Sequence, residues 1–222
     1  MYMNPILYQL IYPTYFISNI LFSSGLTAFL ICECNGKSFV NPELYCHEYF
    51  INKVNKIGHV GKYVVLNYNI VYFLLSQYYL HNETYGFVFE MGQTVKFVLL
   101  LEFIAYVYHR MSHRFPLLYN GLHSIHHRNM EVYPIDFLEF DLTDNIAQTL
   151  YINLPLYFVP MNIYTYTLVY YIYATGAFLI HSDLLNNDHV IHHKYFKYNF
   201  ALLLPIFDIL FGTYRTKMIH GE

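Results

Sequence analysis

Apolar residues gather in long stretches that polar segments separate, and this pattern predicts helices long enough to cross a membrane. Residues 5–31 are almost entirely apolar, and a helix of that length spans the roughly 30 Å hydrocarbon core of a bilayer. Residues 33–61 are polar and mixed, and we expect a short surface-lying helix with loops there. Residues 62–80 form a second apolar stretch, which we interpret as another span.

The second half of the chain repeats this pattern with clearer breaks. A third span is predicted over residues 94–108, and the same helix should continue out of the bilayer through His113. Residues 143–181 are apolar but are interrupted by Pro155 and Pro160. Because proline ends or kinks a helix, two helices joined at a bend fit this region better than one long helix. The last apolar stretch, FALLLPIFDILFG, is too short to span and is expected to pack or lie at the interface.

Composition supports a membrane protein. Hydrophobic residues make up 56% of the chain and charged residues 12%, whereas soluble domains hold about 25% charged residues. The net charge of −3 is too small to indicate a nucleic-acid partner. We therefore predict an all-α fold, an integral membrane bundle of about four spanning or hairpin helices with a histidine-rich helical cap.

The distribution of basic residues predicts how this bundle faces. If all the histidine clusters share one side, then of the 12 Lys and Arg residues only Lys96 falls elsewhere. Cytoplasmic segments of membrane proteins carry an excess of Lys and Arg. The histidine face is therefore expected in the cytosol.

Histidines form the strongest chemical signal in the sequence. His109 and His113 are spaced i, i+4, which places two imidazoles on one face of a helix. An H-x-x-H-H pattern follows, and it recurs near the C-terminus after a single histidine that ends an apolar stretch. Together these clusters hold nine histidines: His109, His113, His123, His126, His127, His181, His189, His192 and His193.

These clusters indicate a metal site. A neutral imidazole offers a lone pair that iron and zinc accept readily. One metal needs about four to six ligands, so nine histidines suit two metals that share a cluster. Two adjacent metals can bind and reduce dioxygen and so give an oxidant able to break an unactivated C–H bond. The remaining histidines are interpreted as ordinary polar residues: His47, His59, His81 and His220.

A second metal site near the N-terminus is a weaker alternative. Cys32, Cys34, Cys46 and His47 could bind zinc, but their spacing fits no common zinc finger. Three clustered cysteines also give no disulfide framework.

Acidic residues near the clusters are candidates for supporting the ligands. Glu102, Tyr106, His109 and His113 are spaced 4, 3 and 4, so they share one helical stripe. A carboxylate in a bilayer helix is costly and usually has a partner, and Glu102 is placed to accept a hydrogen bond from a ligand imidazole. Three aspartates are further candidates for the same role: Asp183, Asp188 and Asp208.

The order and spacing of these residues resemble a known family. The chain is similar to the fatty acid hydroxylase and sterol desaturase superfamily of integral-membrane, non-haem di-iron enzymes, over about residues 100–215. The motifs that carry the resemblance are Glu102-x-x-x-Tyr106-x-x-His109-Arg110-x-x-His113, Leu118-Tyr119-x-x-x-His123-x-x-His126-His127, His181-Ser182, His189-x-x-His192-His193, Asn199-Phe200 and Asp208-Ile-Leu-Phe-Gly-Thr-Tyr.

The resemblance implies that the nine histidines bind two irons, for which zinc can substitute in purified protein. It implies O2 as co-substrate, electrons from cytochrome b5 or a similar carrier with its reductase, and residence in the endoplasmic reticulum membrane. The lipid substrate would be a sterol or a fatty acyl or sphingoid chain; HHKYFKYNF most resembles sterol C-5 desaturases. The division is then residues 1–93 as N-terminal membrane helices with a polar surface segment, and residues 94–222 as the catalytic region of a single domain.

The chain departs from the family pattern at three positions. Glu102 stands where the family usually has Asp, Asp141 where many sterol-type relatives have His, and Phe207 where a Trp is usual. No fused cytochrome b5 domain is present in the sequence, so the resemblance implies a separate electron donor. None of these departures removes a histidine of the clusters.

Four functions can be considered for such a site, and the sequence supports them to different degrees. Lipid hydroxylation or desaturation fits the full histidine set. A non-catalytic metal-binding membrane protein that binds or regulates a lipid enzyme is the alternative. A metal transporter would carry ionisable residues within its spans, where only Lys96 and Glu102 qualify. A zinc protease is disfavoured because the H-E-x-x-H arrangement is missing.

Overall fold

The computed structural model describes residues 5–43, 47–76, 80–81, 83–185 and 188–216, and these residues are mostly helical. The long helices are α1 (Pro5–Cys34), α2 (His47–Ser76), α3 (Phe87–Arg114), α5 (Leu142–Asn153) and α6 (Ile163–Leu179). The short ones are α4 (Pro116–Leu118), η1 (Tyr119–His123), η2 (His126–Arg128), η3 (Pro134–Leu138), η4 (Leu154–Tyr157), α7 (Asp188–Tyr195) and α8 (Ile206–Leu210). A parallel pair of short strands, β1 (Leu80–His81) and β2 (Met161–Asn162), ties two connections together.

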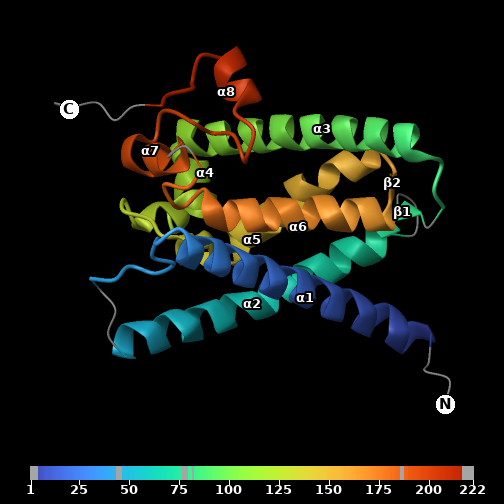
Figure 1. The fold of residues 1–222 in the computed structure, drawn as a ribbon, viewed down its shortest axis with the longest axis horizontal. Coiled ribbons are helices and arrows are strands. Elements are labelled where there is room, and N and C mark those ends of the chain that lie inside the picture. Colours follow the sequence, from blue (N-terminus) through green and yellow to red (C-terminus); the bar gives the residue numbers. More distant parts are fainter. Residues whose placement is uncertain (1–4, 44–46, 77–79, 82, 186–187, 217–222) are drawn as a thin grey trace.

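The long helices form a bundle whose short helices gather at one end. Figure 1 shows α3 along one edge, α6 between α3 and α1, and α2 crossing α1. The core of the bundle is apolar, with Phe97, Leu101, Leu156 and Met161 almost completely buried. The C-terminal end of α3 lies beside α4 and α7, so this end of the bundle carries the helical cap.

α3 is a single helix that runs past the predicted span into the cap, as expected. Phe97, Leu101 and Ala105 are buried at intervals of four residues, which is the stripe that a helix presents to a core. The helix stops at Phe115, whose backbone is extended at φ −110° and ψ 116°. This conformation is the one that a following proline, here Pro116, imposes.

The region 143–181 forms two helices joined at a bend, which confirms the predicted hairpin. Pro155 lies in η4 directly after α5, and Pro160 precedes β2. The side chain of Asn162 then accepts hydrogen bonds from the backbone N–H groups of the first turn of α6, as a helix cap does.

The surface helix predicted within residues 33–61 forms in the second half of that range and is largely exposed, but it is not short, because it is the first part of α2. α2 begins at His47 and continues unbroken to Ser76. Lys53, in this part of α2, is buried and forms ion pairs with Asp136 in η3 and with Glu139 directly after it. A polar residue that suggested a solvent-facing segment is therefore held in the interior by charges far along the chain.

One described segment, Phe16–Cys34 in α1, has the length and apolar character needed to cross a membrane. The four-span arrangement and the cytosolic direction of the cap stay predictions. The division of the chain at residue 94 is likewise an expectation.

Candidate metal centre

The cap brings all nine predicted ligands together from five parts of the chain. The end of α3 carries His109 and His113, the η1 and η2 turns carry the first H-x-x-H-H, and α7 carries the second. His181 lies two residues after the end of α6. The side chains of His109 and His113 are half-buried and the other seven are buried.

The histidines divide into two groups, within each of which the ligand nitrogens lie no more than 4.8 Å apart. The first group holds five residues: His109, His113, His123, His127 and His192. The second holds four: His126, His181, His189 and His193. The grouping supports the inference of two metals and adds what the sequence left open, namely which histidines belong together.

Separations between the Nε2 atoms test whether the groups fit a metal. In the first group Nε2 of His127 lies 3.0 Å from those of His113 and His123. In the second group the Nε2 atoms of His189 and His193 are 3.2 Å apart. When two nitrogens bind the same metal ion at about 2.1 Å each, and the N–metal–N angle lies between a right angle and the tetrahedral angle, the nitrogens are roughly 3.0–3.4 Å apart. The donor set therefore fits a first-row metal ion in each group.

The electrostatic state of the cap suits metal binding as well. Burial, aided by the neighbouring His126, lowers the pKa of His113 to about 4. Burial also lowers the pKa of His126 to about 4. Both imidazoles are thus neutral at pH 7, which is the form that binds a metal.

Main-chain carbonyls orient several of the ligands. When Nε2 faces a metal, Nδ1 carries the proton and needs an acceptor. Four imidazoles have one within hydrogen-bond distance: His109 donates to Phe200 O at 2.9 Å, His181 to Ala177 O at 2.8 Å, His192 to Tyr198 O at 2.7 Å and His193 to Asn129 O at 3.2 Å.

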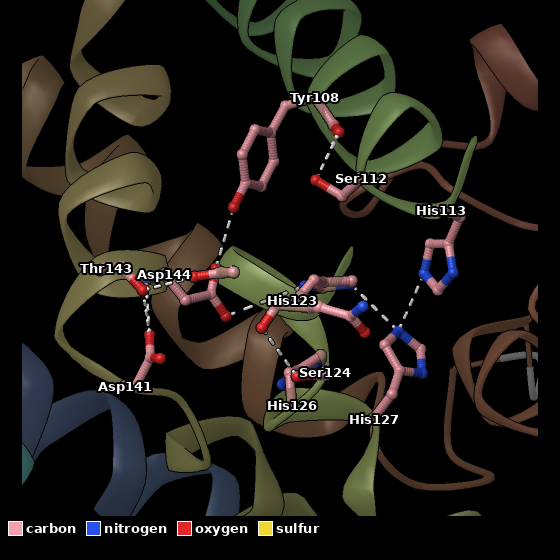
Figure 2. Close-up of polar contacts among 12 residues, drawn as sticks. Tyr108, Ser112, His113, His123, Ser124, His126, His127, Asp141, Thr143 and Asp144 are labelled. Atoms are coloured by element: carbon pink, nitrogen blue, oxygen red, sulfur yellow. Dashed lines mark hydrogen bonds and ion pairs between the residues drawn. The ribbon is translucent and has the colours of Figure 1, made fainter. Parts of the chain in front are cut away.

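A carboxylate that the sequence analysis gave no role faces a fifth ligand. Figure 2 shows Asp144 between Tyr108 and His123. Its Oδ2 lies 3.8 Å from Nδ1 of His123, and its Oδ1 accepts from the Tyr108 hydroxyl at 3.0 Å. Asp144 is 1% exposed. The sequence offered little signal for this role, because Asp144 is one of several polar residues in α5.

The predicted hydrogen bond from a ligand imidazole to Glu102 is wrong. The Glu102 carboxylate accepts instead from the backbone N–H groups of residues 202–204 and from the Tyr173 hydroxyl. The helical stripe does place Glu102 below the cap, but the 202–204 segment lies within reach of its longer arm. Glu102 thus holds the segment next to Phe200, whose carbonyl orients His109.

Tyr106 and Asp208 act on the same segment and not on an imidazole. Asp208 accepts from the backbone N–H groups of Phe200 and Ala201 and from the Thr213 hydroxyl. The Tyr106 hydroxyl lies 3.1 Å from the same Thr213 oxygen. The expected direct support of ligands by Asp208 and Tyr106 is therefore corrected to bracing of the loop that follows α7.

The two other aspartates also serve elsewhere. Asp188 begins α7, one residue before His189, and its main-chain carbonyl accepts from the Asn199 side chain. Asp183 pairs with Lys37 at the surface. Neither is hydrogen-bonded to an imidazole in the described part of the chain.

The weaker site candidates lie away from this centre. His59 is exposed on α2, and the His81 ring stacks edge-on with Tyr85. Cys32 is buried and Cys34 exposed. His220 and Cys46 lie outside the described residues, so the alternative zinc site stays a prediction.

Fold and site together define a helical protein whose cap holds two adjacent histidine groups, each able to bind a metal ion. The family model for fatty acid hydroxylase matches residues 94–213, and the chain belongs to this family. That range contains all nine clustered histidines.

Relatives point to one branch of the family. The chain is 29% identical over 139 residues to a Delta(7)-sterol 5(6)-desaturase of Eremothecium gossypii, covering 59% of this chain and 39% of the relative. It is 30% identical over 143 residues to one of Schizosaccharomyces pombe, covering 60% of this chain and 43% of the relative. The chain thus spans about two fifths of the length of these relatives. No solved structure matches.

Proposed function

We propose that the chain is a membrane-bound, non-haem di-iron oxidoreductase that uses O2 to hydroxylate or desaturate a lipid. The observation that carries the proposal is the pair of adjacent histidine groups, one of five residues and one of four. Family membership supports the reaction class. The sterol desaturase relatives and the HHKYFKYNF segment favour a sterol over an acyl or sphingoid chain.

In this proposal the five-histidine group would hold one iron and the four-histidine group the other. When bound, the irons supply reduction of dioxygen to an oxidant that can remove hydrogen from an unactivated carbon. The chain holds the ligand rings by their Nδ1 hydrogen bonds and keeps the imidazoles neutral by burial. It also excludes water, since seven of the nine rings are buried.

Electrons and location complete the proposal. A cytochrome b5 or similar carrier with its reductase would deliver electrons to the cap. The concentration of Lys and Arg on the side of the histidine clusters supports a cytosolic cap. The apolar segment Phe16–Cys34 supports a membrane location, which we infer to be the endoplasmic reticulum by family resemblance.

Lipid mass spectrometry in expressing cells tests the proposal. Wild type, His126→Ala and His59→Ala would each be expressed with a cytochrome b5 and its reductase. We expect a lipid that gains one oxygen or loses two hydrogens in wild type and His59→Ala, because His59 is exposed and belongs to neither histidine group. His126→Ala should lose both iron and product.

Two results would overturn the proposal. Full product from His126→Ala would remove the metal centre from the reaction. Purified wild type that holds two irons yet changes no lipid, in this host or with lipids of its native host, would favour the alternative, a metal-binding protein that binds or regulates a lipid enzyme.

A further inference from the structure

A small cavity adjoins the metal centre on the side that faces the bundle. It measures about 60 Å³, and five of the clustered histidines form part of its wall. A second cavity of about 70 Å³ lies deeper among α2, α3, α5 and α6. The two cavities share a wall of five side chains: Phe137, Gln148, Tyr151, Ala177 and Leu202.

The deeper cavity adjoins in turn a groove at the surface between α1 and α2. This groove measures about 500 Å³. Figure 1 shows that α1 and α2 cross. Deep cavity and groove share four apolar side chains: Leu21, Val64, Leu138 and Phe140. Three neighbouring spaces therefore lead from the surface to the histidines, separated only by side chains.

The groove opens where the bilayer would lie. On α1 it is lined by residues from Leu21 to Phe29, which fall inside the apolar segment Phe16–Cys34. Phe22 is 72% exposed there. An exposed aromatic residue in the middle of a membrane helix faces lipid and not water.

The walls also indicate what can pass. No charged side chain lines either the deep cavity or the groove in the described part of the chain. The polar groups of the deep cavity are two amides, Asn145 and Gln148, and tyrosine hydroxyls. An ionised headgroup would be costly in such surroundings, whereas an alkyl chain or a sterol ring system is not.

We propose that a lipid substrate enters sideways from the bilayer through the α1–α2 groove and threads an uncharged segment past Gln148 and Ala177 to the histidines. The occupant is thus an apolar lipid segment, a sterol skeleton or an alkyl chain, with any charged headgroup left outside. The proposal rests on the proposed function, because oxidation of a lipid requires an apolar segment to reach the histidines. The shared side chains Leu138 and Phe140 are the ones that must move aside for the lipid.

Two glycines on α2 provide a matched pair of variants. Gly61 lines the groove, and Gly58, one turn earlier, does not. A Cβ added at either position meets nothing within 4 Å, so both accept a larger side chain. Gly61→Trp should fill the groove, and Gly58→Trp should leave it open.

We expect Gly61→Trp to keep its iron but to lower product formation by about tenfold or more, because blocked binding reduces kcat/KM. Gly58→Trp should stay within about twofold of wild type, as surface substitutions usually do. If Gly61→Trp fails to fold, Leu26→Trp can replace it, because Leu26 lines the groove from α1. Its control is Leu30→Trp, since Leu30 is exposed on the same helix but does not line the groove. A folded, groove-filling variant with wild-type product formation overturns the path.

Photolabelling separates failure of the path from failure of the function. Purified wild type and both glycine variants would be irradiated with a diazirine-bearing stearic acid and, separately, a diazirine-bearing cholesterol, and labelled peptides would be mapped. Labelling of residues 135–140 that Gly61→Trp abolishes supports the path even if no lipid is oxidised. Labelling that Gly61→Trp leaves unchanged overturns it even if wild type is active. The probe that labels more strongly identifies the sterol or the alkyl chain as the occupant.

Discussion

Replacing Asp144 by Asn removes the carboxyl group that faces a ligand while leaving the size of the side chain nearly unchanged. The carboxylate Oδ2 lies 3.8 Å from Nδ1 of His123, which is beyond hydrogen-bond distance but close enough to attract a proton on that nitrogen. An amide oxygen at the other position can still accept from the Tyr108 hydroxyl. The substitution therefore isolates the electrostatic orientation of one imidazole.

The expected loss follows from the position of His123 in the five-histidine group. Removing an outer partner of a ligating histidine typically weakens metal binding by about 10–100-fold, which is about 1.4–2.7 kcal/mol. Only one of the two metals should be affected, since Asp144 faces no member of the four-histidine group among the described ion pairs and hydrogen bonds. Asp144→Asn should therefore release one metal well before the other.

A chelator titration of the zinc-loaded protein measures this directly, with bound zinc determined by elemental analysis. Asp141→Asn is the control, because it makes the same chemical change one turn away, where the side chain caps α5 by accepting from the Asp144 N–H at 2.8 Å. Asn caps a helix about as well as Asp, so this variant should match wild type. Equal zinc affinities at both sites in Asp144→Asn, or an equal loss in Asp141→Asn, would refute the reasoning.

Three further predictions concern stability. Glu102→Gln should lower the melting temperature while both metals stay bound. The two carboxylate oxygens accept from three main-chain N–H groups, and the amide replaces one of these oxygens with a donor, which costs about 1–3 kcal/mol. Metal loss without a change in melting temperature would contradict this prediction. Lys53→Ala should destabilise by about 3–5 kcal/mol, because it removes the ammonium that neutralises two buried carboxylates, whereas Lys62→Ala on the exposed side of the same helix should shift melting little. Two cap histidines have a pKa lowered to about 4, below the unfolded value of about 6.5. The metal-free protein should therefore lose stability as pH falls from about 6.5 toward 4 and gain none above 6.5; equal melting temperatures across that range would contradict this.

Local pattern was sufficient where local chemistry decides the structure. The course of α3 and the bend between α5 and α6 follow from apolar spacing and from proline, both visible in the sequence. The extent of α2 was not predictable in this way. Its polar residue Lys53 is held by carboxylates 83 and 86 positions away, and no local pattern reveals a partner at that distance.

The same limit explains the error over Glu102. A helical stripe states which residues share a face, and it correctly put Glu102 below His109 and His113. It does not state what covers that face. The covering segment is residues 202–204, about 100 positions further along the chain. Its main-chain N–H groups donate to the Glu102 carboxylate, which therefore bonds to them and not to an imidazole.

The division of the nine histidines between the two groups shows how local pattern and tertiary packing combine. In each H-x-x-H-H motif the i, i+4 pair stays in one group: His123 with His127, and His189 with His193. The middle histidine, His126 or His192, goes to the other motif's group. Successive residues in a helix point about 100° apart, so adjacent histidines must diverge, but only the docking of α7 against η2 decides where each one arrives. Each motif contributes its middle histidine to the group that contains the other motif's i, i+4 pair, so neither group is complete without both motifs. The cap must therefore assemble as a unit before either group has its full set of histidines.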